Sequence, residues 1–406
     1  MAIAVRTLEE VDVAGWVDCM SIGFLTHAPD GEAAYRRQGM DLTRTWGAFD
    51  GDRVVATLRS FPTTLTTPGP AAVTAAALTN VTVAPTHRRQ GLLSQMITSE
   101  LRASRERDEA LGILIASEYP IYGRFGYGAA CEAASYSIDA SRARFLAPGE
   151  GAVELVDEAA LRKEAPAIYE QVRSVRPGFI DRSDRWWDRA LHQVEVPGGE
   201  PWKGYQALYR SPGGAAEGYV RYRAKSDWDQ MRPKGTVTVD ELTTATPRAY
   251  RRLWQYCCDI DLVATVEAGD RSVDEPLPWL LADARMVRQT ARFDFLWTRI
   301  LDVCAALTQR SYPVEGRVVL EVVDPLGLAG GRFALDGGPD GAGCAPSGES
   351  AGLTLPVDAL GSAFLGGVPV ETLAAAGRVD RHDAAALATA GAMFRSAPTP
   401  WCSTWF

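Results

Sequence analysis

The sequence has few of the residues that build metal sites or disulfide frameworks. Its seven cysteines are odd in number and form no C-x-x-C pair, and its four histidines lie far apart along the chain. We therefore expect neither structural zinc nor a set of disulfides, and no metal ion of any kind. Scattered, reduced thiols are typical of the cytoplasm, which is where we expect this protein.

Long apolar runs and an excess of positive charge are also missing. No apolar run approaches the roughly 20 residues of a membrane helix, and the first residues lack the basic-then-apolar pattern of a signal peptide. The 42 Lys and Arg residues face 51 Asp and Glu residues, for a net charge of -9. Nucleic-acid-binding proteins usually carry a basic patch, so we expect neither a nucleic acid nor a membrane as partner. The 406 residues suffice for two or three folded domains.

Residues 1–140 are expected to form a first α/β unit. Hydrophobic periodicity predicts strands and helices in the order β-α-α-β-β-β-α-β-α-β. Asp50-Gly51 predicts a tight hairpin turn between two of the strands. The expected strands are 3–8, 45–50, 52–61, 71–83, 111–117 and a closing strand at 131–140, and the expected helices are 9–24, 32–40, 89–107 and 119–125.

Residues 141–292 repeat the first part of this order without repeating its sequence. A strand at 153–157 precedes two helices, three strands and a further helix at 247–260, so we predict an internal duplication of fold. Residues 293–406 are expected to form a third α/β unit, which begins with a strand leading into a helix. The chain ends in WCSTWF, and because two Trp and one Phe offer a large apolar area, we expect this end to be packed against the protein.

The most informative segment is the turn between the strand at 71–83 and the helix that follows it. The turn contains Arg88, Arg89 and Gly91. Backbone N–H groups at a helix N-terminus lack intrahelical partners, and glycine lets a phosphate approach them while arginine adds full charges. The segment predicts a pyrophosphate cradle, and the alternative is an ordinary turn with surface arginines. The corresponding turn of the second unit, within 237–253, has no glycine, which predicts that its cradle has been lost.

Two motifs together resemble the GCN5-related N-acetyltransferases. R-x-x-G-x-L at 88–93 is similar to the family's acetyl-CoA motif Q/R-x-x-G-x-G/A, with Leu93 in the last position. Y-x-x-x-G-Y at 122–127 is similar to the segment that follows the family's fifth strand. The segments EPLPWLLAD, LWTRILDVCAAL and GRFAL narrow the resemblance to the Eis (enhanced intracellular survival) family and extend it over nearly the whole chain.

This resemblance implies a fold, an activity and an assembly. The fold is a tandem pair of acetyltransferase units, the first active and the second degenerate, followed by a sterol-carrier-protein-like α/β domain at 293–406. The activity is acetyl transfer from acetyl-CoA to a primary amine, with aminoglycosides, polyamines and lysine side chains as acceptor types. The assembly is a homohexamer.

The resemblance also implies roles for single residues. Tyr122 is carried over as the general acid, since a phenol with a pKa near 10 is protonated at neutral pH, and Tyr127 is its rival, interpreted as packing. The C-terminal carboxylate of Phe406 is carried over as the base. A main-chain N–H near Val83 is expected to meet the oxyanion.

The expected cofactor-binding residues form three groups along the motif region. A stretch of strand pairs with the pantetheine arm, the turn and helix start hold the pyrophosphate, and the end of the next strand borders the other side. In chain order these residues are Val81, Thr82, Val83, Arg88, Arg89, Gln90, Gly91, Leu92, Leu93, Ser94, Ser117 and Glu118.

Three alternatives stay open at this point. A covalent route through Cys19 or Cys131 is one, although neither lies in a motif that activates a thiol. His27 and His87 are further acid–base candidates, and His27 follows the helix where such folds form the acceptor pocket, which we expect to be less acidic and more aromatic than in aminoglycoside-acetylating members. The third is a non-catalytic protein that binds an apolar ligand in its C-terminal domain.

Overall fold

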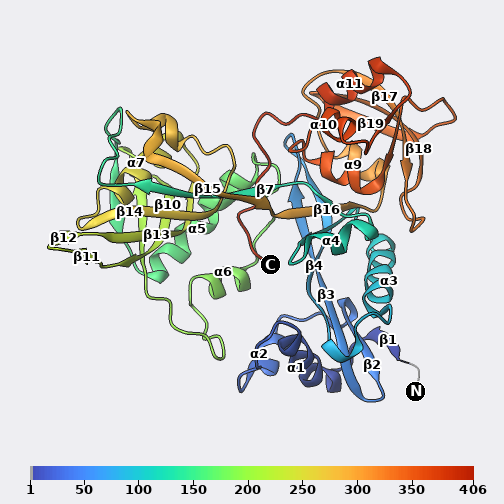
Figure 1. Ribbon diagram of the computed structural model, residues 1–406, viewed down its shortest axis with the longest axis horizontal. Helices are drawn as coiled ribbons and strands as arrows, with labels where there is room; N and C mark the ends of the chain where they lie inside the picture. Colours follow the sequence, from blue (N-terminus) through green and yellow to red (C-terminus); the bar gives the residue numbers. More distant parts are fainter. Residues whose placement is uncertain (1–2) are drawn as a thin grey trace.

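The computed structural model describes residues 3–406 and contains two seven-stranded sheets, a five-stranded sheet and a two-stranded ribbon (Figure 1). None of the helices in that range combines the length and the apolar character that crossing a membrane requires. Each larger sheet belongs to one of three α/β units that follow one another along the chain, and the third unit lies beside the first (Figure 1).

The first sheet has the strand order β1-β2-β3-β4-β5-β16-β6. Helix α1 packs on β3 and β4, and α3 packs on β2, β3 and β4. The hairpin predicted at Asp50-Gly51 is confirmed, since β2 and β3 pair in antiparallel fashion around Gly51. The elements are β1 Ala4–Thr7, α1 Val13–Gly23, α2 Glu32–Arg37, β2 Thr45–Asp50, β3 Arg53–Thr66, β4 Ala72–Val83, α3 Leu92–Glu106, β5 Leu111–Ile115, α4 Tyr119–Tyr122, β6 Gly128–Ala129 and β16 Leu296–Ile300.

The second sheet has the strand order β15-β7-β14-β13-β10-β9-β8. Its strands β13 and β14 are parallel and are joined through α7, just as β4 and β5 are parallel and joined through α3. The predicted repetition of the element order is therefore present. The elements are β7 Glu132–Asp139, β8 Ala152–Leu155, α5 Glu158–Arg173, α6 Asp184–Ala190, β9 Tyr205–Arg210, β10 Ala216–Lys225, β11 Trp228–Asp229, β12 Arg232–Pro233, β13 Gly235–Thr244, α7 Pro247–Cys258, β14 Val263–Arg271 and β15 Val287–Asp294.

The first two sheets exchange strands at their junction. Strand β7, expected to close the first unit, instead pairs with β14 and β15 of the second sheet, so that expectation is wrong. Strand β16, from the expected third unit, pairs with β5 and β6 of the first sheet. Periodicity identifies a strand but not its partner. Here the partners are set by antiparallel pairing of 132–138 with 287–294 in the second sheet and of 128–129 with 297–298 in the first. The boundaries at 140 and 293 stay predictions, and both lie at these paired segments.

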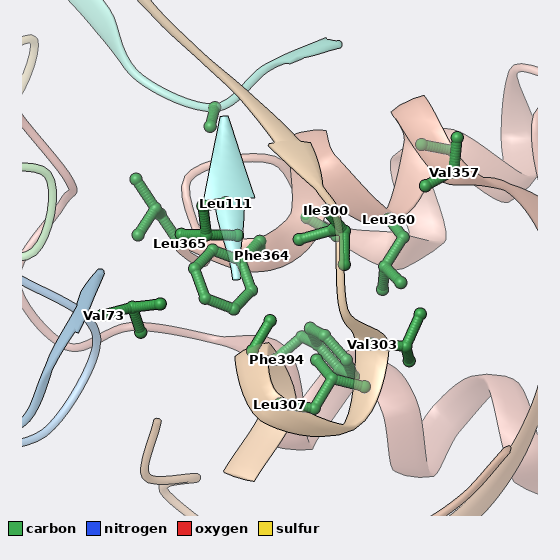
Figure 2. Packing of buried hydrophobic residues seen from close by; sticks show 14 of the residues in the cluster. Val73, Leu111, Ile300, Val303, Leu307, Val357, Leu360, Phe364, Leu365 and Phe394 are labelled. Atoms are coloured by element: carbon green, nitrogen blue, oxygen red, sulfur yellow. The ribbon is translucent and has the colours of Figure 1, made fainter. Parts of the chain in front are cut away.

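The third unit shares its core with the first sheet. Figure 2 shows Val73 and Leu111 of the first sheet close to Phe364 and Leu365 of the third unit, and all four are buried. Because residues of both units belong to one buried hydrophobic cluster, the two units pack against each other as a single body. The elements are α8 Val303–Thr308, β17 Gly316–Val323, β18 Gly331–Gly338, β19 Gly341–Pro346, β20 Leu353–Pro356, α9 Val357–Phe364, α10 Val370–Ala375, β21 Asp380–Arg381 and α11 Ala384–Phe394, in a sheet ordered β19-β18-β17-β20-β21.

A glycine permits a close backbone contact between these two units. A Cβ atom built on Gly128 of β6 would lie 1.9 Å from the carbonyl oxygen of Asp358 in α9, a distance that no real structure tolerates. That neighbour is backbone and cannot rotate away. The backbones of β6 and α9 therefore approach each other only because residue 128 has no side chain.

We expect Gly128→Ala to destabilise the protein by about 1–3 kcal/mol, because α9 must move away from β6. Gly343→Ala in β19 is the matched control, since a Cβ there meets nothing within 4 Å, and its effect should stay within about 0.5 kcal/mol. Urea denaturation followed by tryptophan fluorescence measures both. Equal midpoints for the two variants would show that the units are not held together at this contact.

Candidate functional site

The parallel strands β4 and β5 separate part-way along their length. Their register pairs Ala75 with Leu111 and continues only to the pair formed by Leu78 and Leu114. Strand β4 runs on to Val83, paired with β3 on one side but with no strand of the described chain on the other. The edge of residues 79–83 thus carries backbone donors and acceptors that an extended ligand can pair with.

A β-bulge lies where the strands separate. The pairing of β3 with β4 shifts between Thr57 and Arg59, which leaves Asn80 and Val81 opposite a single residue of β3. Asn80 has a φ of 55°, and the Thr57 hydroxyl donates a 2.7 Å hydrogen bond to the Asn80 carbonyl oxygen. Bulges bend a strand and redirect its backbone groups. The irregular backbone of β4 therefore lies at Asn80 and Val81, shortly before the position near Val83 at which the oxyanion donor is expected.

The turn after β4 has the geometry of an anion cradle. Arg89 and Gly91 have φ values of 64° and 77°, and α3 begins at Leu92. The Gln95 N–H bonds to the Gly91 carbonyl at 3.0 Å, so the N–H groups that precede Gln95 in the helix have no intrahelical acceptor. A Cβ on Gly91 would meet nothing within 4 Å, which leaves open space in front of these donors.

The other residues predicted for the cradle surround this space in different ways. Arg88, Arg89 and Gln90 are exposed, whereas Leu92 is buried in the core of the first unit. Leu93 and Ser94 are half-buried on the first turn of α3. These groups fit a pyrophosphate. The backbone N–H groups can donate to its oxygen atoms, and the exposed guanidinium groups can balance its negative charge.

A cavity of about 770 Å³ opens beside the separated strands. It brings together four of the predicted site residues: Val81 of β4, Ser117 after β5, Tyr122 of α4 and the terminal Phe406. Thr82, Val83 and Glu118 do not line it. Glu118 instead precedes α4 as its N-cap residue. The motif region and the chain terminus, 284 residues apart in sequence from Tyr122 to Phe406, thus share one cavity.

The two tyrosines of the second motif have different surroundings. Tyr122 lines the cavity, and burial together with Glu118 raises its pKa to about 12. Tyr127 lies in the core, does not line the cavity, and has a pKa raised further by complete burial. Within residues 3–406 its hydroxyl finds no hydrogen-bond partner. Of the two, only Tyr122 is placed to give a proton to a ligand in the cavity.

The C-terminal segment is hydrogen-bonded to the second unit and packs against the first. Trp401 and Trp405 donate from their indole nitrogens to Asp270, at 2.9 Å and 2.8 Å. Arg182 donates to the Thr404 hydroxyl at 2.9 Å, and the Phe406 ring packs edge-on against Phe61 of β3. The expectation that the aromatic end is packed is confirmed. Figure 1 shows the C-terminus between the first two units, close to α6.

The histidines and the candidate nucleophilic cysteines are placed unequally. His27 lines the cavity, as expected for the acceptor side, whereas His87 lies 3.5 Å from Asp50 in a separate cavity beside Gln90 and Leu92. Burial raises the pKa of Cys19 to about 11 and that of Cys131 well above its usual value. Buried thiols with raised pKa values are poor nucleophiles.

The sequence analysis missed a group of arginines in the cavity wall. Arg36 comes from α2, Arg59 from β3, and Arg185 and Arg189 from α6 of the second unit. The two on α6 are four residues apart and so lie on one helix face. That spacing is visible in the sequence, but nothing in the sequence shows that this face meets a cavity of the first unit.

Three family models match the chain. Two are described as acetyltransferase (GNAT) domains and cover residues 4–130 and 178–300, and the third is described as a sterol carrier protein domain and covers 303–403. The predicted order of a tandem pair followed by a sterol-carrier-protein-like domain is thereby confirmed.

Similar full-length proteins agree with these matches. An uncharacterized N-acetyltransferase of Streptomyces avermitilis is 43% identical over 100% of this chain and 99% of its own. The N-acetyltransferase Eis of Mycobacterium tuberculosis is 37% identical over 86% of this chain and 85% of its own. The crystal structure of Eis1 from Mycobacterium abscessus matches with a TM-score of 0.87 and 33% identity, over 99% of this chain and 100% of that one.

Proposed function

The chain belongs to the Eis family of GCN5-related N-acetyltransferases, and we propose that it transfers the acetyl group of acetyl-CoA directly to a primary amine in the cavity of the first unit. One observation carries this proposal. The free edge of β4 leads from the anion cradle at one end to a cavity that contains Tyr122 and the terminal Phe406 at the other.

The proposed cofactor site uses the residues of the predicted motif. The backbone of 79–83 would pair with the pantetheine arm, and the bulge at Asn80 and Val81 would supply the N–H group for the carbonyl oxygen. Arg88, Arg89, Gln90, Gly91 and the start of α3 would hold the pyrophosphate. Ser117 and Glu118 would border the other side. The second unit has no glycine at its equivalent turn, where Thr246 caps α7, so we propose the first unit as the one that binds acetyl-CoA.

Tyr122 is proposed as the general acid. As the amine nitrogen bonds to the acetyl carbon, the carbon–sulfur bond of the thioester breaks, and the departing thiolate takes the phenolic proton of Tyr122. A pKa of about 12 keeps this phenol protonated throughout the neutral range. The buried thiols of Cys19 and Cys131 argue against an acyl-enzyme, which supports direct transfer.

The C-terminal carboxylate of Phe406 is proposed as the group that accepts the proton lost by the amine. Its ring packs on Phe61, and the segment before it is held by Asp270 and Arg182, so the end of the chain is held at the cavity. Within residues 3–406 no arginine, lysine or histidine lies within ion-pair distance of this carboxylate, which leaves it free to accept a proton.

Membership of the family also bears on the oligomeric state and on the alternative function as a carrier. We propose the homohexamer that the resemblance to the Eis family implies. The alternative of a non-catalytic carrier of apolar ligands loses its support, because the family is one of N-acetyltransferases.

We expect Tyr122→Phe to lower kcat about 100-fold and to leave the KM for acetyl-CoA nearly unchanged, because only proton donation is lost. Tyr127→Phe removes the same single oxygen atom from a core position and should retain nearly full activity. Steady-state assays of free thiol release with both variants measure this. Loss of activity in Tyr127→Phe but not in Tyr122→Phe would show that the proposed assignment of the acid to Tyr122 is wrong.

The pH dependence of the wild-type rate gives a further prediction. Deprotonation of Tyr122 should cause no loss of rate below about pH 10, since the pKa of this phenol is about 12.

Extending the chain by two glycines after Phe406 moves the carboxylate away from the cavity while keeping every side chain. We expect turnover to fall at least about tenfold, with the affinity for coenzyme A unchanged. Phe406→Leu keeps the carboxylate and changes only the ring, so it should retain more activity than the extended chain. Unimpaired turnover in the extended chain would remove the terminal carboxylate from the mechanism.

A further inference from the structure

More basic than acidic side chains line the cavity. Four arginines line it: Arg36 from α2, Arg59 from β3, and Arg185 and Arg189 from α6. Figure 1 shows α6 reaching from the second unit toward α2 of the first, and Arg185 joins them by donating to the Tyr35 carbonyl at 2.8 Å. The charged surface is thus built by two units.

Few acidic groups compensate these arginines. Two acidic side chains line the cavity. One of them, Glu32, forms an ion pair with Arg36 at 2.5 Å. The other, Asp181, accepts hydrogen bonds from the Thr63 hydroxyl and the Thr64 N–H, both at 2.6 Å. Across residues 3–406, no carboxylate lies within ion-pair distance of Arg59, Arg185 or Arg189. Three guanidinium groups therefore line the cavity without an ion-pair partner among the described residues. Asp41 offsets only part of the repulsion at Arg59, and the terminal carboxylate of Phe406 lies in the same cavity.

Arg59 is the most deeply placed of them. Its guanidinium donates to the Gly39 carbonyl, and its Nε is buried without a partner among the described residues. Burial, followed by repulsion from Arg36, Arg185 and Arg189, lowers its pKa to about 10. A charged group pays for burial unless an opposite charge accompanies it, so this wall is suited to bind an anion.

We propose that the acetyl acceptor carries an anionic group, a carboxylate or a phosphate, next to its primary amine, and that Arg59, Arg185 and Arg189 bind this group. The proposal rests on the proposed acetyl transfer and specifies its substrate class. A planar guanidinium binds either anion through two hydrogen bonds. Polyamines and aminoglycosides, by contrast, would bring further positive charge to an already positive wall.

The anion of the acceptor would bind at the arginine wall while its amine reaches the part of the cavity lined by Tyr122 and Phe406.

Matched acceptor pairs test this proposal with the full-length protein. The carboxylate arm compares amino acids with their amides, the phosphate arm compares glucosamine 6-phosphate with glucosamine, and spermidine represents polycations. In at least one arm, we expect the anionic member to have a kcat/KM at least about tenfold above its neutral twin, and the arm that shows it identifies the anion. Neutral amines or spermidine acetylated as well as the anionic members would overturn the proposal and leave acetyl transfer intact.

Two arginine variants separate anion binding from other roles. Arg59→Gln and Arg189→Gln should each reduce the anionic preference several-fold while leaving the calorimetric Kd for coenzyme A unchanged. Arg189 is exposed, so its variant keeps the test valid if Arg59→Gln fails to fold. Arg102→Gln, at an exposed position of α3 outside the cavity, is the matched control and should retain the full preference.

The outcomes distinguish the two levels of the proposal. An unchanged preference in both variants would show that the anion binds elsewhere, and would overturn the assignment of these arginines. If the protein bound coenzyme A but acetylated none of the amines tested, the proposed function itself would be overturned, and the proposed acceptor class with it.

Discussion

The separation of β4 from β5 is the constraint on which the site depends. Parallel pairing ends at Leu78 and Leu114, and the bulge at Asn80 and Val81 turns the rest of β4 away. A sheet edge inside a protein is costly unless something pairs with it, so the free edge of 79–83 is itself a reason to expect a ligand with an extended amide chain. The cradle at the start of α3 lies just beyond the end of this edge, and the cavity with Tyr122 lies along it.

The other units complete what the first sheet begins. The second unit contributes α6 to the cavity wall and holds the C-terminal segment through Asp270 and Arg182. The third unit packs on the first sheet, where the absence of a side chain at Gly128 permits backbone contact with α9. The second unit thus has a physical role at this cavity, since it positions both the arginine-bearing helix and the chain terminus there.

Local patterns predicted the elements and motifs well, because they depend on residues close in sequence. The hairpin at Asp50-Gly51, the turn at Gly91 and the packing of the aromatic end follow from local chemistry. The partners of β7 and β16 did not follow, because a strand's periodicity carries no information about which edge it joins. The arginines of α6 were missed for the same reason: their helical spacing shows a common face, whereas most of the cavity that this face meets is formed by distant segments of the chain, such as β3 and the C-terminus.

The central claim is that the cradle and the free edge of β4 together bind coenzyme A. Isothermal titration calorimetry of coenzyme A against the wild type and Gly91→Val tests it most directly. A valine at a φ of 77° is strained and its side chain would enter the open space in front of the helix donors. The account predicts measurable binding to the wild type and an affinity at least about tenfold weaker in the variant. Equal affinities, or no binding to the wild type, would contradict it.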